Sequence, residues 1–188
     1  KKLSCILNPQ KKTEYKKIEE EDVVIFTGDV KLSVSKPSQE IYIEADNVTF
    51  NRSRSTIYAE GNVIFTEVGK GKDDSQESLT ASSLLFNTET MEGVFDSARV
   101  VQESSKNINL TNGATLIVSS ELFGKENSGT ITFKNGVLTF CDDENPHWKI
   151  KASRIWLLPG NEFSFFNALL FVGNLPIFYM PFFYYPKD

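Results

Sequence analysis

One histidine and a short acidic run are the residues of this 188-residue chain whose types best suit catalysis or metal binding. His147 lies just after the run Asp142-Asp143-Glu144. A Ser-His-Asp site would have to use this one histidine, and no Gly-x-Ser-x-Gly turn accompanies it. The acidic run lacks the alternating spacing of a calcium loop, and one histidine with two cysteines gives too few ligands for a zinc site. We therefore expect no enzyme activity, no metal, no cofactor, and a solvated turn around His147.

The two cysteines, Cys5 and Cys141, raise the separate question of a disulfide. A bridge between them would close a loop of about 136 residues and tie the start of the chain to its last quarter. Each cysteine could instead bond to a cysteine outside this sequence, or both could be free thiols. The residues alone leave these three alternatives open.

Composition excludes several classes of protein. The formal net charge is -5 and no basic stripe follows Lys17, so nucleic acid is not an expected partner. Hydrophobic residues make up 40% of the chain, which excludes a disordered protein, and the 15 Phe, 6 Tyr and 2 Trp favour strands. The sequence starts at Lys1 with neither an initiator Met nor an apolar signal core, so we expect a mature or trimmed chain.

Alternation of apolar and polar residues predicts strands through most of the chain. Residues 1–22 mix lysines with acids and are expected to form a flexible arm. From Val23 onward, apolar residues fall on alternate positions, the period of a half-buried strand. One strand type places a small residue before an alternating apolar pair, as in Ala59-x-Gly61-x-Val63-x-Phe65.

In the second strand type the apolar parity changes halfway. Ile43 and Ala45 share one parity, whereas Val48 and Phe50 share the other, so we expect a β-bulge at Asp46-Asn47 that bends the strand. The small residue at position 45 returns at positions 81, 120 and 152, and strands of the first type lie between these positions. Each repeat is therefore a strand pair. Because one pair cannot bury its apolar face alone, about five pairs should stack. The predicted fold class is all-β, an open, V-shaped β-jellyroll of stacked strand-pair repeats over residues 23–160.

The inward positions of these strands are apolar throughout. Two facing sheets joined by bulged bends would enclose them, either as a filled core or as a groove partly open to acyl chains. Small residues at the repeated Ala and Gly positions leave room and favour the groove slightly. The candidate lipid-binding groove residues are Phe26, Val30, Leu32, Ile43, Phe50, Val63, Phe65, Leu84, Phe86, Val100, Phe133, Leu138, Ile150 and Leu157.

Residues 161–188 form an aromatic, proline-rich end. No charged side chain occurs from Phe163 to Pro186, but Pro176, Pro181 and a turn at Gly173-Asn174 exclude a membrane-spanning helix. Two or three short strands are expected instead. Both faces of residues 163–172 are apolar, so another surface should cover them.

This end of the chain carries a resemblance to a known family. The string NALLFVGNLPIFYMPFFYYP, preceded by Cys141-Asp142-Asp143 and by Trp148-x-Ile150-x-Ala152, resembles the end of the periplasmic domain of the LptD family of outer-membrane lipopolysaccharide transporters. The segments 45–50 and 59–63 resemble the repeats shared by LptA, LptC and LptD. The resemblance implies an OstA-like domain on the periplasmic side of the outer membrane. Such a domain would receive lipopolysaccharide by its acyl chains and pass it to a β-barrel for insertion in the outer leaflet.

The same resemblance implies roles for single residues and partners. Cys141 by context, and Cys5 by position only, resemble cysteines that LptD bridges to its barrel. Pro176, Tyr179 and Pro181 would lie at the junction between residues 161–188 and such a barrel. The implied partners are lipopolysaccharide or a related lipid, an LptA-like bridge protein paired to the N-terminal edge strand, and an LptE-like lipoprotein with the barrel. The alternatives are a soluble LptA- or LptC-like bridge protein and a structural β-repeat scaffold with a filled core.

Overall fold

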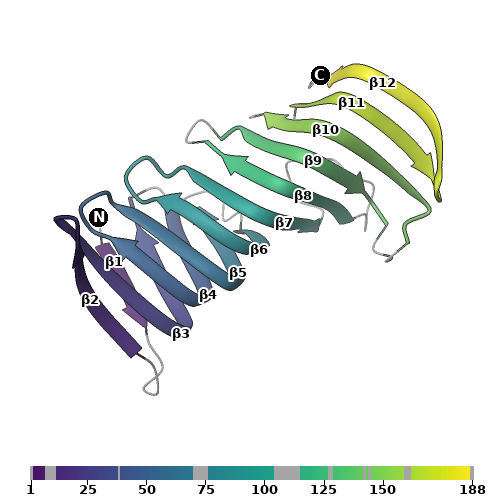
Figure 1. Ribbon diagram of the computed structural model, residues 1–188. Coiled ribbons are helices and arrows are strands. Elements are labelled where there is room, and N and C mark those ends of the chain that lie inside the picture. The colour runs from purple at the N-terminus through teal and green to yellow at the C-terminus, as the bar shows by residue number, and fades with distance from the viewer. Residues whose placement is uncertain are drawn as a thin grey trace. The chain divides into compact units, whose positions relative to one another are not determined.

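The computed structural model describes residues 2–6, 12–37, 39–69, 76–103, 115–126, 129–141, 143, 145–158 and 162–186. Every regular element in these ranges is a β-strand, which confirms the all-β prediction. None of them contains a helix long and apolar enough to cross a membrane. The strands, labelled in Figure 1, are β1 (Lys2–Ile6), β2 (Lys12–Ile18), β3 (Glu21–Ser35), β4 (Gln39–Asn51), β5 (Thr56–Gly69), β6 (Gln76–Asn87), β7 (Gly93–Glu103), β8 (Thr115–Lys125), β9 (Ile131–Thr139), β10 (Trp148–Leu158), β11 (Glu162–Val172) and β12 (Leu175–Tyr185).

The chain divides into two compact units, each built from antiparallel neighbours. In the first unit, Lys1–Phe95, strands β3 to β6 pair in sequence order, and both β1 and β2 pair with β3. In the second unit, Asp96–Asp188, strands β8 to β12 pair in sequence order. The strand order does not close on itself, which confirms the open, jellyroll-like fold class.

The structure differs from the flexible arm expected over residues 1–22. β1 pairs with the second half of β3, where Cys5 lies opposite Leu32, and β2 pairs with the first half, where Tyr15 lies opposite Val24. The side chains of β2 are exposed or half-exposed. Main-chain pairing therefore holds β2 in place, and a composition of lysines and acids gives no sign of such pairing.

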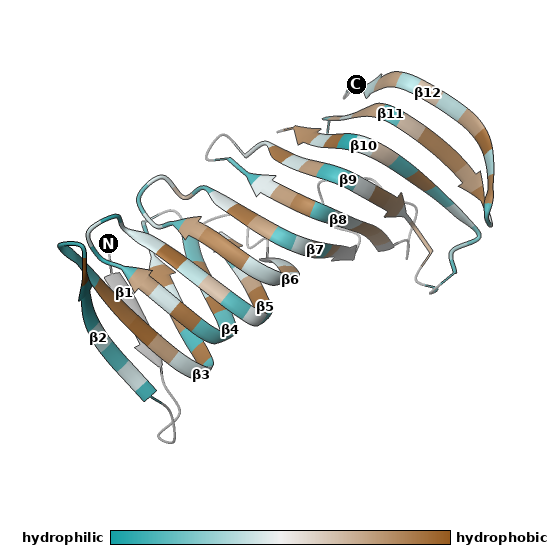
Figure 2. Cartoon of the chain, in the orientation of Figure 1, coloured by the Kyte–Doolittle hydropathy of each residue, from teal (hydrophilic) through white to brown (hydrophobic). Residues whose placement is uncertain are grey.

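The aromatic end forms two paired strands, as expected, although each is 11 residues long instead of short. Gly173 lies at the turn between them with a φ of 58°, and its amide donates to the carbonyl oxygen of His147 at 2.7 Å. Pro176 and Pro181 lie in β12, the last strand in the order. A proline is tolerated there because an edge strand leaves one side of its backbone without a ladder partner. Figure 2 shows hydrophobic residues along most of β11.

In each odd-numbered strand from β3 to β11, one non-glycine residue adopts the left-handed backbone region and marks a bend, and a glycine with positive φ precedes it in β3 and β5. Pairing skips these residues, as between Thr27 and Val30 of β3 and between Glu60 and Val63 of β5. The bend predicted at Asp46-Asn47 therefore lies at the correct position along β4. The strand register shows, however, that the extra residue belongs to β3 and β5, the neighbours of β4. Most of these residues are Asn or Asp, which tolerate this region best among non-glycine residues. They are Asp29, Asn62, Ser97, Asn135 and Asn167, with φ of 32°, 47°, 51°, 52° and 55°.

Candidate functional site

The candidate groove residues lie on the apolar side of their strands, and most are buried by the chain itself. The half-buried ones are Phe26, Phe50, Val100, Ile150 and Leu157. The buried ones are Val30, Leu32, Ile43, Val63, Phe65, Leu84, Phe86, Phe133 and Leu138. A ligand could touch the first set directly, whereas it could reach the second only if the protein rearranged. Their role in binding lipid stays a prediction.

Three phenylalanines fill the interior of the first unit. The ring centroid of Phe65 lies 5.6 Å from that of Phe86 and 5.1 Å from that of Phe95. Phe65 and Phe86 come from opposite halves of the bent strands, since Phe65 pairs in register with Leu79 and Phe86 with Ile57. All three side chains are at most 2% exposed. Aromatic contacts therefore join the two halves of the bent strands and occupy the space between them.

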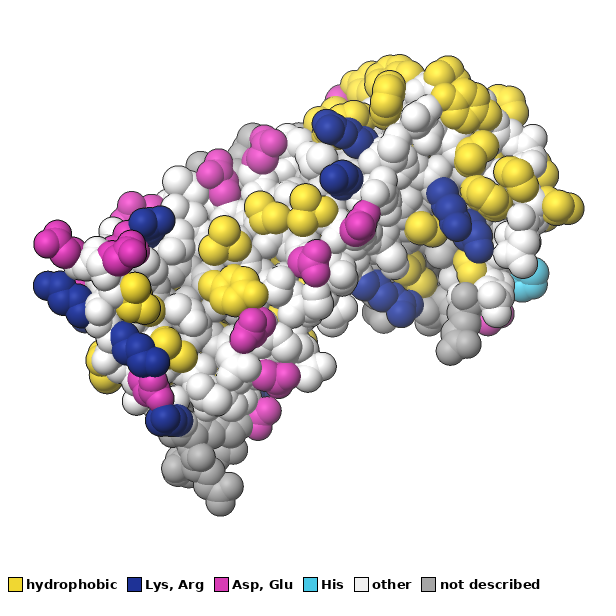
Figure 3. Space-filling model, in the orientation of Figure 1, with side chains coloured by type: hydrophobic (Ala, Val, Ile, Leu, Met, Phe, Trp, Pro, Cys, Tyr) yellow, Lys and Arg dark blue, Asp and Glu magenta, His cyan; other side chains and the backbone are white. Residues whose placement is uncertain are grey.

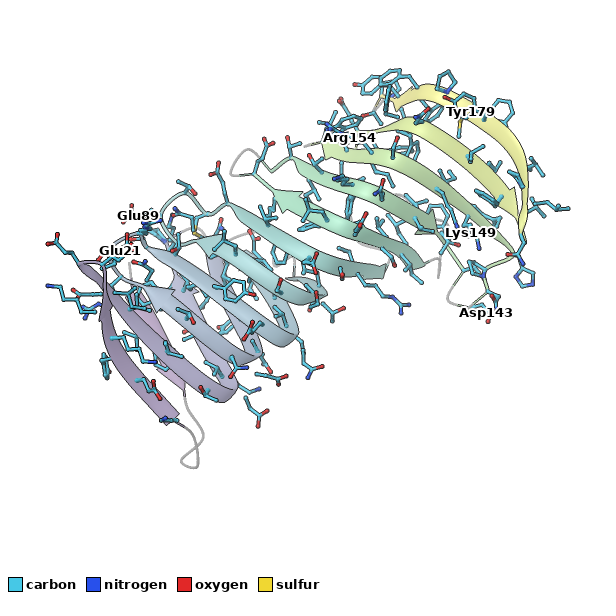
Figure 4. All side chains as sticks on the ribbon, in the orientation of Figure 1. Glu21, Glu89, Asp143, Lys149, Arg154 and Tyr179 are labelled. Atoms are coloured by element: carbon cyan, nitrogen blue, oxygen red, sulfur yellow. The ribbon has the colours of Figure 1, made fainter. Side chains whose placement is uncertain are left out.

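A polar contact joins the strand ends of the same unit. Lys36, in the turn after β3, donates from Nζ to the backbone oxygen of Glu89, in the turn after β6, at 2.8 Å. In an antiparallel order these two turns belong to opposite strand ends, so the hydrogen bond links the two ends of the bent strands. Ser55 adds a hydrogen bond from its Oγ to Glu89 Oε1 at 2.8 Å. Figure 4 shows Glu89 near Glu21, whose carboxylate accepts hydrogen bonds from Asn51 and Arg54.

The second unit leaves more of its apolar side accessible. Ile155 and Phe165 are buried opposite each other at the centre of β10 and β11. Towards the strand ends, Leu157 pairs with Phe163 and Ile150 with Leu170, and all four side chains are only half-buried. The Phe163 ring also stacks on Tyr185 of β12, with 5.0 Å between centroids. In β10 and β11, solvent therefore reaches the inner side at both ends of the strands.

Cys141 lies in the loop before β10. Its Sγ is 3.7 Å from Nδ1 of His147, and its amide donates to Thr139 Oγ1 at 3.1 Å. The Thr139 hydroxyl in turn donates to the backbone oxygen of Trp148 at 2.8 Å. These bonds explain why a threonine that is only 6% exposed sits at the end of β9. They fix the loop close to β10.

The pairing of the two cysteines stays a prediction. Cys141 is a free thiol among the described residues. The side chain of Cys5 lies outside the described residues, as do Asp142 and Glu144 of the acidic run. In the described ranges, no three side chains of His, Cys, Asp or Glu gather where a metal ion could bind.

The three residues expected at a barrel junction lie exposed on β12. Tyr179 donates from its hydroxyl to Asn167 Oδ1 on β11, so the bend residue of β11 also fixes a side chain of the neighbouring strand. Pro176 pairs in register with Phe171, and pairing skips Pro181. Their position on an edge strand is compatible with a junction, and the junction itself stays a prediction.

Sequence reasoning missed some residues that shape this site. Phe163 and Leu170 line the accessible part of the groove, and their register opposite Leu157 and Ile150 could have identified them. No sequence signal pointed to the contact of Lys36 with Glu89, since the two residues are 53 positions apart.

Comparison with known proteins shows which protein family the chain is related to. No family model matches its sequence. The LPS-assembly protein LptD of Vibrio cholerae serotype O1 is 30% identical over 141 residues, which are 74% of this chain and 16% of that protein. LptD of Shewanella oneidensis is 26% identical over 84% of this chain and 18% of its own length, and LptD of a Pseudomonas putida strain is 26% identical over 90% and 16%. The chain thus spans less than a fifth of the length of these relatives. Over most of its own length, this chain is an LptD-like domain.

Proposed function

We propose that this chain is the periplasmic part of a lipopolysaccharide-assembly protein at the outer membrane and that its apolar side binds acyl chains. The observation that carries the proposal is the similarity of most of the chain to proteins named LPS-assembly protein LptD. The apolar side of the strands supports it, because an acyl chain gains about 0.8 kcal/mol for each methylene that leaves water. This function makes and breaks no covalent bond.

The proposed contact site for the lipid is the inner side of β10 and β11. Ile150, Leu157, Phe163 and Leu170 are half-buried there, so an acyl chain can cover apolar surface that water now touches. To enter the interior of the first unit, an acyl chain must displace Phe65 from Phe86 and Phe95, and the two halves of the strands must separate at Lys36.

The proposal extends to the partners at each end. An LptA-like bridge protein would pair with the edge of the first unit, where β1 and β2 each pair only with β3 among the described strands. Lipopolysaccharide would leave towards a β-barrel that begins beyond Pro176, Tyr179 and Pro181, accompanied by an LptE-like lipoprotein. The barrel would insert the lipid in the outer leaflet.

A structural β-repeat scaffold is the second candidate. The observation in its favour is the interior of the first unit, where Phe65, Phe86 and Phe95 pack tightly together. A filled core stabilises a repeat protein without any guest molecule. The two candidates differ in whether lipid reaches the apolar side.

Photo-cross-linking of the purified chain with lipopolysaccharide tests the proposal. A photo-reactive residue at Ile150 or Leu157 should label lipid, whereas one at Ile64, which is 39% exposed on the outer side of β5, should not. Phe65, the neighbour of Ile64 in the same strand, should label more weakly than Ile150 because it is buried. Labelling at Ile64 equal to that at Ile150, or no labelling at either, would contradict the proposal and leave the scaffold.

A further inference from the structure

The outer side of β11 and β12 is exposed and almost entirely apolar. Its residues lie opposite one another in register, Phe166 with Phe182 and Leu169 with Tyr179. This side faces away from the candidate groove, since the groove side of β11 carries Phe163, Phe165 and Leu170. Figure 3 shows hydrophobic side chains gathered over these two strands. We call this surface the outer aromatic patch; it consists of Phe166, Leu169, Tyr179, Phe182 and Tyr184, which are between 36% and 61% exposed.

A row of cations borders the outer aromatic patch. On β10, Lys149 lies opposite Phe171, Lys151 opposite Leu169 and Arg154 opposite Phe166. Lys134 of β9 continues the row beside Arg154. Figure 4 labels Lys149 and Arg154 on β10 and Tyr179 on β12, and Figure 3 shows Lys and Arg side chains next to the hydrophobic ones. We call Lys134, Lys149, Lys151 and Arg154 the basic row.

The charges of the basic row are not neutralised by the described part of the chain. No carboxylate there forms an ion pair with any of its four side chains. Lys151 instead places Nζ 5.3 Å from the centroid of the Phe171 ring, a cation-π contact. Glu162 at the start of β11 accepts a hydrogen bond from the Tyr184 hydroxyl at 2.7 Å, which raises the pKa of that phenol. The row is therefore open to anions from outside the chain.

The outer aromatic patch together with the basic row matches the surface of a lipid bilayer. Exposed apolar patches of this kind mark interaction sites, and Tyr side chains with flanking Lys and Arg are typical of the depth where lipid head groups meet acyl chains. A protein partner would have to supply a line of carboxylates spaced to fit β9 and β10. Anionic lipids supply phosphates anywhere along the row, directly beside the apolar layer that the aromatic residues need.

We propose that the outer side of β11 and β12 docks on a membrane surface that contains anionic lipid. The outer aromatic patch enters the boundary between head groups and acyl chains, and the basic row binds lipid phosphates. This surface is distinct from the groove side of the same strands. The docking therefore goes beyond the proposed transport function, and it holds whether or not lipopolysaccharide binds on the groove side.

Vesicle flotation of the whole chain tests the proposal. The probes are vesicles of phosphatidylcholine alone and vesicles in which about a third of the lipid is phosphatidylglycerol. The chain should bind the anionic vesicles far more tightly, and added salt should weaken that binding. Replacing Lys149, Lys151 and Arg154 together by Gln should lower the partition coefficient on anionic vesicles roughly a hundredfold, about fivefold per cation.

A matched control separates this surface from net charge. Replacing Lys12, Lys16 and Lys31 by Gln removes the same three charges, but from side chains in the first unit that already pair with carboxylates. This variant should bind anionic vesicles as the parent chain does. Equal loss of binding in the two triple variants would overturn the proposal, because net charge alone would then explain it.

A variant of the patch gives the second readout. Phe182→Ser should weaken binding to both kinds of vesicle, because the side chain is 61% exposed and its loss removes apolar contact without opening a core. Light scattering of the chain without vesicles completes the test. Self-association that Phe182→Ser abolishes, with no binding to either vesicle, would assign this surface to a second copy of the chain and refute membrane docking.

Discussion

Replacing Phe65 by Ala would measure whether the interior of the first unit is a packed core. The side chain is 2% exposed and contacts the rings of Phe86 and Phe95. A buried Phe→Ala substitution costs about 3–5 kcal/mol, because apolar transfer energy is lost and a cavity stays behind. Since small domains are stable by only about 5–15 kcal/mol, a large share of the stability of this unit should disappear.

Urea denaturation followed by circular dichroism is the assay. The matched control is Ile64→Ala in the same strand, where the side chain is 39% exposed and should contribute less than about 1 kcal/mol. A double-mutant cycle with Phe86→Ala should give a coupling of about 0.5–1.5 kcal/mol from the aromatic pair. A loss at Phe65 no greater than that at Ile64 would refute the reasoning, since an interior held open for a guest would not depend on this ring.

Three further substitutions or titrations test local features. Gly61→Ala should destabilise the chain by at least about 1 kcal/mol in thermal unfolding, because φ is 77° and the new Cβ would overlap the side chain of Asp46. In an NMR titration, the pKa of the Glu14 carboxyl should be about 2 instead of 4.5, because Lys12 bonds and pairs with it. The stability that the ionised Glu14 carboxylate gives the fold is then complete above pH 4.5 and is lost as the pH falls towards 2. Thr139→Val should cost about 1–3 kcal/mol and speed hydrogen exchange in the loop before β10, because two partly buried hydrogen bonds disappear.

Each of these tests has a control or an outcome that would contradict it. Gly124→Ala should have a much smaller effect than Gly61→Ala, because the nearest atom to its new Cβ is a backbone oxygen at 4.0 Å. Lys12→Gln should raise the pKa of Glu14, and a Glu14 that titrates near 4.5 in the parent chain would contradict the ion pairs. Unchanged exchange of the Cys141 amide in Thr139→Val would show that the loop does not depend on the hydroxyl.

The repeated apolar alternation was sufficient to predict strands and their buried faces. Ile43, Val63 and Ile155 are fully buried, as their parity indicates, because a pleated strand sends alternate side chains to one side. The turn at Gly173-Asn174 was predictable for a similar reason, since a glycine between two aromatic runs supplies the left-handed backbone that the turn needs.

Features that depend on distant partners could not be read from the sequence. β2 is held by pairing with β3, and its own lysines and acids carry no signal of that partner. The parity change at Asp46-Asn47 located a bend but not the strand with the extra residue, because register is a property of two strands together. The apolar residues of the tail predicted a surface that needs cover, whereas the alignment of Lys149, Lys151 and Arg154 beside it depends on the pairing of β10 with β11.

The left-handed residues at the bends also have a mechanical consequence. Asn62, Asn135 and Asn167 have no register partner, while the ladder resumes on both sides of each. Each strand therefore behaves as two stiff arms connected by one torsional pivot. Widening or narrowing the angle between the arms changes few hydrogen bonds, so the compliance of each unit is concentrated at these single positions. Proline, whose ring fixes φ at about -65°, cannot adopt the left-handed backbone of a pivot, so it would disrupt the bend without touching either apolar face.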